Sequence, residues 1–357
     1  FWVLDDITPL RQYNDSVPQQ QAHLFNPAAT NHTVFGGSPF GGGGAVGKNP
    51  PGGAVIYYWL KDSLKKPEKK DGAAAGGDSG KTEGDKSEAP KIRLEILDAS
   101  GKTIRKFPKK EVAGGSDDED FFSRGGGAAD LPADAGLNRF VWDLRYEGAT
   151  KVPKAPLWGG STEGPVALPG AYQVRLTVLD KSSTAPLEIT SDPRLTVTQA
   201  DLTRQFDLLM KIRDQLSTTN DTILQIRQLR EQISAVDKHV GSAANDKAII
   251  EAGKSLNKKL TEVEEVLVQT KAKSGQDVLN YPVRLNNHFA ALGGVVGSAD
   301  TAPTQQSYEV FELLSKQLSE QMAKWNEIVS TDVPAYNSLV KQRDVPALKV
   351  TASNASK

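Results

Sequence analysis

The spacing of the apolar residues changes near residue 198 of this 357-residue chain. Before that point they tend to alternate with polar residues, as in 138–145, where Phe140, Trp142 and Leu144 share one face. After it, they recur every three or four residues, beginning with Leu202. The first period belongs to β-strands and the second to α-helices, so the sequence predicts a β region followed by an α region.

The β region is predicted to cover residues 54–197. Its strand candidates are 54–60, 92–98, 103–107, 138–145, 171–178, 187–189 and 195–197. The turn sequence at 98–102 predicts that the second and third strands form a hairpin. Several short alternating strands separated by turns are typical of a β-sandwich, here of immunoglobulin-like type.

Two insertions interrupt this region. Residues 61–90 are almost entirely Lys, Glu, Asp, Gly and Ala, and cannot bury enough apolar surface to offset the entropy of ordering, so a disordered insertion is expected. Residues 113–130 form an acidic, Gly-rich loop. A Gly/Pro-rich linker at 36–53 precedes the region.

The α region is predicted to form an up-and-down helical bundle over 198–345, followed by a tail at 346–357. Thr198 and Asp201 have the spacing of a capping box. Pro282 and Pro303 are expected near the starts of the third and fourth helices, and the fourth is expected to continue past a kink near Pro334. The apolar positions that define the first helix repeat at sevens, with isoleucines between them: Leu202, Leu209, Leu216, Ile223, Ile212, Ile226 and Ile233.

Charge and composition exclude several functions. Lys and Arg total 43 against 44 Asp and Glu, so neither nucleic acid nor an anionic membrane is an expected partner. No apolar run is long enough to span a bilayer. The chain has no Cys, which excludes disulfides, thiolate metal sites and Cys nucleophiles.

Two short motifs resemble known binding sites but lack neighbouring residues that those sites require. Residues 42–48 match the first seven positions of a phosphate-binding loop, but Asn49 stands where Ser or Thr should hold magnesium, and Pro50 follows. A flexible linker is the preferred interpretation, and no cofactor is predicted. Asp117, Asp118 and Asp120 are candidate cation ligands, but they lack the alternating spacing of a calcium loop, which favours a solvated acidic loop.

No catalytic residue is predicted. The four histidines are scattered, and there is no Gly-x-Ser-x-Gly turn for a hydrolase nucleophile. Two aromatic residues are candidate binding residues: Trp158, in a Gly-rich loop between strands, and Tyr58, in the aromatic strand at 54–60. The alternative is that Trp158 folds back onto the sandwich or the bundle.

Residues 1–7 have the pattern of a strand, and the loop-like residues that follow offer it no obvious partner. The sequence 1–11 (FWVLDDITPLR) resembles the closing strand of large exported bacterial β-propeller proteins, of sortilin-type and sialidase-like kind, many of them described as glycosyl hydrolases. The resemblance extends over 136–146, 157–162, 169–176, 192–195 and 281–287. The middle strands also resemble the immunoglobulin-like domain of flagellar hook-cap proteins.

This resemblance implies an exported protein in which residues 1–35 are the remnant of a propeller blade and its exit segment. The expected function is that of a non-catalytic C-terminal module that supports the propeller or binds a glycan or a protein. The alternative is that the chain contributes a loop, for example at Trp158, to the active site of a glycosidase-like hydrolase. The Asp-box of sialidase blades is not present, so the resemblance supplies no catalytic residues.

Overall fold

The structure is a computed structural model that describes residues 6–33, 52–64, 91–108, 131–240, 244–341 and 346–351. The expected combination of strands and helices is confirmed, and the chain divides into two compact units. The sheet unit contains the described residues up to Leu144 together with 168–195. The helical unit contains 145–167 and the described residues from 196 onward. Residues 145–167, which the sequence assigned to the β region, therefore belong with the helices.

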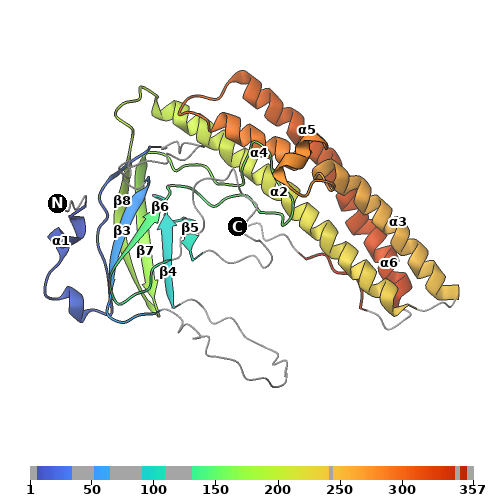
Figure 1. Ribbon diagram of the computed structural model, residues 1–357, viewed down its shortest axis with the longest axis horizontal. Helices are drawn as coiled ribbons and strands as arrows, with labels where there is room; N and C mark the ends of the chain where they lie inside the picture. Colours follow the sequence, from blue (N-terminus) through green and yellow to red (C-terminus); the bar gives the residue numbers. More distant parts are fainter. Residues whose placement is uncertain are drawn as a thin grey trace, which may run out of the picture. The chain divides into compact units, whose positions relative to one another are not determined.

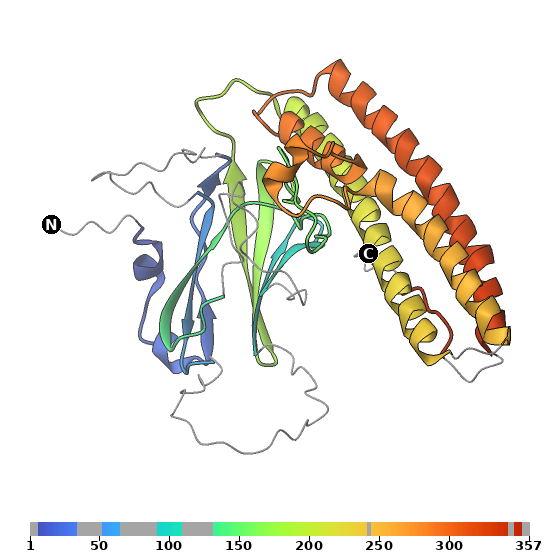
Figure 2. The same cartoon turned by 45° about the vertical axis from the view of Figure 1, so that its right-hand side comes forward.

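The sheet unit is built from two sheets (Figures 1 and 2). The smaller has the order β1-β3-β6 and is antiparallel, with β1 at Ala22–Leu24, β3 at Ala54–Leu60 and β6 at Gly136–Trp142. The larger has the order β2-β8-β7-β4-β5. Its strands are β2 (Thr30–Asn31), β8 (Lys181–Thr190), β7 (Gly170–Val178), β4 (Ile92–Leu97) and β5 (Thr103–Phe107), and only the pairing of β2 with β8 is parallel.

The two sheets meet through their buried aromatic residues. Phe140 of β6 lies 4.6 Å from Phe107 of β5, and Trp142 lies 6.1 Å from Tyr172 of β7, measured between ring centroids. Along β3 every second residue is buried, which is the predicted alternation. The apolar side chains of both sheets thus form one core in this unit.

Most strand predictions are confirmed, including the β4–β5 hairpin, in which Leu94 pairs with Phe107. Residues 195–197 do not form a strand. β6 ends at Trp142 rather than at 145, because Leu144 has a φ of 61° and its backbone leaves the extended conformation. The short strands β1 and β2, which lie in the supposed blade remnant, pair with β3 and β8.

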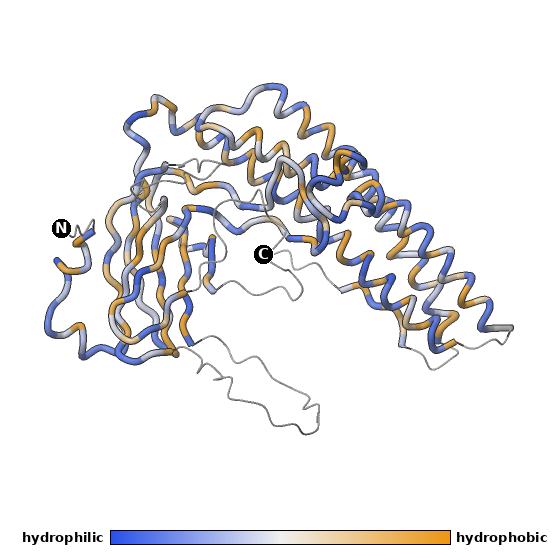
Figure 3. The backbone as a smooth tube through the Cα atoms, in the orientation of Figure 1, coloured by the Kyte–Doolittle hydropathy of each residue, from blue (hydrophilic) through white to orange (hydrophobic). Residues whose placement is uncertain are grey.

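In its described residues, the helical unit contains four main helices and a fifth, shorter one (Figure 1). They are α2 (Gln199–His239), α3 (Ala244–Leu267), α4 (Leu285–Val296), α5 (Gln305–Glu327) and α6 (Val333–Val340). Figure 2 shows α3 running back alongside α2, and Figure 3 shows apolar residues recurring along these helices. Their buried side chains form one cluster, which includes Leu260, Phe289 and Trp325.

The start of α2 is confirmed. The Thr198 side chain accepts a hydrogen bond from the Asp201 amide at 3.1 Å, and the Asp201 side chain accepts one from the Thr198 amide. The repeat of seven is not kept throughout, because Leu208 and Leu229 are buried while Leu209 is only partly buried. The buried positions nevertheless recur every three or four residues from Leu202 to Val236, as the predicted stripe requires.

Two other helix predictions need adjustment. α4 begins at Leu285, three residues after Pro282. The expected kink near Pro334 is a π-helical segment, η4 (Ile328–Asp332), which joins α5 to α6. A proline ring obstructs the normal α-helical hydrogen bond, and the wider π turn just before it accommodates that interruption. Shorter helical turns are α1 (Thr8–Gln12), η1 (Val17–Gln19) and η3 (Gly275–Leu279).

Among the described helices, none is both long and apolar enough to cross a bilayer, in agreement with the sequence. Several predictions fall outside the described residues: the first five residues of the opening strand predicted at 1–7, the glycine-rich motif at 42–48, most of the insertion at 61–90, and the acidic residues Asp117, Asp118 and Asp120. Residues 6 and 7, which are described, are not in a strand.

Candidate functional site

Residues 145–167 leave β6 and return to β7 as an irregular hairpin held on the helical unit. Arg145 pairs with Val166 in an isolated bridge, and the Ala149 amide donates to the Thr162 carbonyl at 2.8 Å. A Cβ atom added at Gly148 would lie 2.3 Å from that same carbonyl oxygen. The two arms therefore approach more closely than any side chain would permit.

The first arm of this hairpin is bound by polar side chains of α2. The Asn220 amide donates to the Thr150 carbonyl at 2.6 Å. The guanidinium groups of Arg213 and Arg227 each donate at 2.9 Å, to the carbonyls of Glu147 and Pro153. These contacts involve only the backbone of the hairpin, so they fix its position without requiring particular side chains in it.

Apolar residues of the hairpin join the core of the helical unit. Ala149 is buried there, and Val152, Ala155 and Leu157 pack against the same cluster. Tyr146 meets Phe206 of α2 edge to face, with ring centroids 4.9 Å apart. The hairpin is therefore a packed element of this unit and not a loosely attached loop.

A buried carboxylate strengthens the attachment of α2 to α3. Glu264, 3% exposed, lies 3.1 Å from Arg227 and 2.6 Å from Arg230. Because Arg227 also holds the Pro153 carbonyl, α3, α2 and the hairpin are connected through one guanidinium group. Such a pair is a structural feature, since each charge needs the other in a buried setting.

The tip of the hairpin is bound to α4 by Asn287, which is 5% exposed. Its side-chain oxygen accepts from the Trp158 amide at 2.6 Å, and its side-chain nitrogen donates to the Trp158 carbonyl at 2.7 Å. An amide carries a donor and an acceptor side by side, so it pairs with a peptide as a neighbouring strand would. We call this arrangement an amide clasp.

Glycines permit the close approach of the tip to α4. A Cβ atom added at Gly160 would lie 2.3 Å from the Ala290 carbonyl carbon, and Gly159 has a φ of 70°. The backbone at 158–160 therefore lies directly on the helix. Trp158 is 41% exposed as a whole residue, so this aromatic residue keeps contact with solvent although its backbone is anchored.

The structure thus partly reconciles the two interpretations of Trp158. Its backbone is docked on the helices, as the alternative expected, while its side chain stays accessible. His288 is the next residue of α4 after Asn287 and is also exposed. Desolvation by the surrounding protein, and then the nearby charge of Arg284, lower the pKa of His288 below its usual value.

The prediction that Tyr58 is a binding residue is wrong. Its side chain is fully buried, and its hydroxyl donates to the Pro132 carbonyl. Burial raises the pKa of this hydroxyl. The strand alternates, so Tyr58 faces the core while Tyr57 and Trp59 take the opposite, half-buried face.

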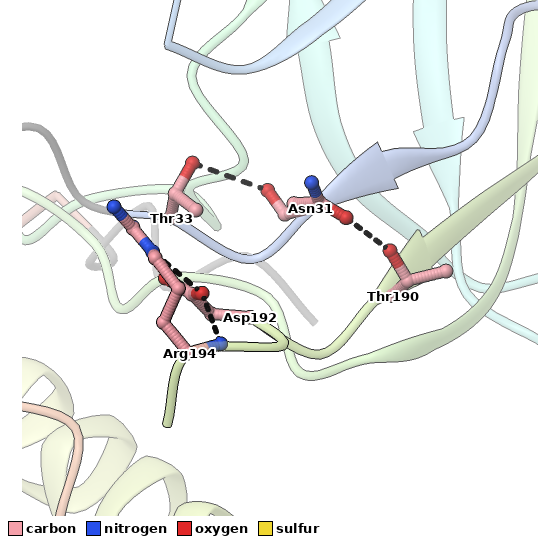
Figure 4. Close-up of polar contacts among 5 residues, drawn as sticks. All are labelled: Asn31, Thr33, Thr190, Asp192 and Arg194. Atoms are coloured by element: carbon pink, nitrogen blue, oxygen red, sulfur yellow. Dashed lines mark hydrogen bonds and ion pairs between the residues drawn. The ribbon is translucent and has the colours of Figure 1, made fainter.

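A second polar cluster lies in the sheet unit, next to the end of β8 (Figure 4). Asp192 accepts from the Arg194 amide at 2.9 Å and from its guanidinium at 2.6 Å. These hydrogen bonds hold the pKa of Asp192 at about 2. Thr190 is bonded to Asn31 of β2 at 2.7 Å. A carboxylate this firmly ionised and paired stabilises a turn and is poorly suited to proton transfer near neutral pH.

Within the described residues, no group of His, Asp and Glu side chains is arranged to hold a metal ion. The three acidic candidates, Asp117, Asp118 and Asp120, are not among those residues. Asn287 was not singled out from the sequence, because an asparagine in the first turn of a helix carries no signal that distinguishes a clasp from a cap.

A comparison with models of protein families found no match for this chain. A comparison with curated proteins also found none.

Proposed function

We propose that this chain is a non-catalytic binding module, and that the Trp158 tip of the hairpin is its ligand-binding surface. The observation that carries the proposal is an exposed indole on a backbone that is hydrogen-bonded at both its amide and its carbonyl. A rigid, amphipathic aromatic ring loses little conformational entropy when a ligand covers it.

A glycan is the ligand class that this surface suits best. Gly159 and Gly160 place no side chains beside the indole, and hydroxyl-bearing Ser161 and Thr162 follow directly. A sugar ring offers an apolar face for the indole and hydroxyl groups for polar neighbours.

The proposed architecture is an immunoglobulin-like sandwich followed by an up-and-down helical bundle, working beside a β-propeller in an exported protein. The contacts between the two sheets and the shared core of the helices support the first two parts. The propeller and the export rest on the resemblance of residues 1–11 and of the strands that follow.

The test is a titration of the ¹⁵N-labelled chain with soluble oligosaccharides, namely hexamers of cellulose, chitin and xylan. The chain has five tryptophans, and the indole resonance lost in Trp158→Phe identifies that of Trp158. We expect this resonance to shift in a saturable manner with at least one hexamer, and binding to be lost in Trp158→Ala.

Trp59→Phe is the matched control, because Trp59 belongs to the sheet unit and packs against Tyr13. Shifts that persist in Trp158→Ala would contradict the proposal. The second candidate, a loop of a glycosidase active site, predicts instead that Trp158→Ala lowers the turnover of the propeller-containing protein without changing glycan binding by this chain.

A further inference from the structure

The last described segment of the chain, residues 346–351, lies on the helical unit in a manner that resembles a bound peptide. Leu348 is 4% exposed and belongs to the helical core, and Val350 packs partly against it. Pro346, Ala347 and Lys349 are exposed. Buried apolar side chains two residues apart are the pattern of an extended chain with one face on a surface. We call this segment the C-terminal strap.

Side-chain amides, rather than another strand, bind the backbone of the strap. Asn337 of α6 forms an amide clasp on Leu348, accepting from its amide at 2.7 Å and donating to its carbonyl at 3.0 Å. Gln232 of α2 forms the same clasp on Lys349, at 2.7 and 2.9 Å. Gln225 donates to the Thr351 carbonyl at 2.9 Å.

The glutamines on α2 form a row. Gln225, Gln228 and Gln232 are spaced by three and four residues and so share one face of the helix over about 10 Å. Gln228 accepts from the Thr351 hydroxyl. Apart from this last contact, the row bonds only main-chain groups, which every non-proline residue possesses. We call Gln225, Gln228, Gln232 and Asn337 the amide row.

We propose that the amide row is a peptide-binding surface that the chain's own C-terminal strap occupies. It fits an extended peptide with apolar side chains at two alternate positions, as in the strap's Leu348 and Val350. The inference does not rest on the glycan-binding role of Trp158, because the two surfaces share none of these residues.

The covalent connection of the strap to α6 explains why the strap occupies the amide row. A short connection to α6 keeps the strap at an effective concentration on the order of 1 mM at the amide row. A free peptide with a Kd of about 0.1 mM would therefore bind roughly tenfold more weakly to a chain whose strap is in place. Release of the strap exposes the surface to other extended segments.

The experiment uses the full chain carrying Leu348→Asp and Val350→Asp, which places charges at the two buried positions and releases the strap. The probe is a fluorescein-labelled hexapeptide with the sequence of residues 346–351, Pro-Ala-Leu-Lys-Val-Thr. Its binding is measured by fluorescence anisotropy. We expect saturable binding to the released chain and about tenfold weaker binding to the wild-type chain. A probe with Asp at the position of Leu348 should not bind.

Variants of the amide row distinguish recognition of the peptide main chain from non-specific binding of the probe. In the released chain, Gln232→Ala with Asn337→Ala should weaken probe binding by tenfold or more, while Gln317→Ala, at an exposed amide on α5, should leave it unchanged. Circular dichroism confirms that each variant keeps its helices. The proposal is overturned if the released chain does not bind the probe, if wild-type and released chains bind it equally, or if the amide-row variants bind as well as Gln317→Ala.

Discussion

Replacing Asn287 by Leu tests whether the amide clasp fixes the Trp158 tip. The substitution keeps the volume of the side chain roughly constant but removes the acceptor for the Trp158 amide and the donor for its carbonyl. Each hydrogen bond contributes about 1 kcal/mol net, so the docked tip should lose about 2 kcal/mol relative to its open form. That corresponds to roughly 30-fold faster hydrogen exchange at the Trp158 amide.

Asn337 supplies a matched control, because it forms the same clasp on Leu348 at the C-terminal strap. Asn337→Leu should accelerate exchange at the Leu348 amide by a similar factor and leave Trp158 unchanged, and Asn287→Leu should do the reverse. Exchange is followed residue by residue by NMR at constant pH. A change of less than about threefold at the clasped amide, or equal acceleration at both sites, would refute the reasoning that each clasp holds its own segment.

Two further predictions concern packing and pH. Gly160→Ala should destabilise the helical unit by about 2 kcal/mol, since its Cβ would lie 2.3 Å from the Ala290 backbone, whereas Gly293→Ala, whose nearest neighbour is Ile212 at 3.6 Å, should stabilise α4 by about 1 kcal/mol. Urea unfolding monitored by circular dichroism distinguishes the two, and shifts of the same sign would contradict the contacts. The pKa of Asp192 is lowered to about 2 from 3.8, so its stabilising contribution is complete above about pH 4 and is lost as the pH falls towards 2. Asp192→Asn should make the sheet unit less sensitive to acid over that range, as measured by tryptophan fluorescence, and an unchanged acid profile would count against the Arg194 pairing.

The periodicity of the sequence predicted the main elements well. β3 and β5 have the predicted limits, and α2 begins with the predicted capping box, because alternation and capping are local signals. The short strands β1 and β2 were missed, since two or three residues carry no measurable period. Tyr58 was misassigned because an aromatic strand does not reveal which of its faces is buried until its partners are known.

The polar residues that organise the helical unit were the hardest to foresee. Thr219 and Asn220 are buried on α2, and Asn287 is buried on α4, although such residues usually lie on the surface. The partner of each of these two asparagines is a backbone group of a residue about 70 or 130 positions away, so no local pattern specifies the pairing.

These contacts give α2 two distinct tasks. Asn220 and Arg227 hold the hairpin at 145–167, while Gln225 and Gln232 hold the C-terminal strap. Hydrogen bonds to a peptide backbone do not depend on the side chains of that peptide. The two attached segments can therefore vary in sequence as long as they stay extended and keep apolar residues at the packed positions. The clasp bonds only the backbone of residue 158, so it does not require the tryptophan side chain to which we assign the proposed binding role.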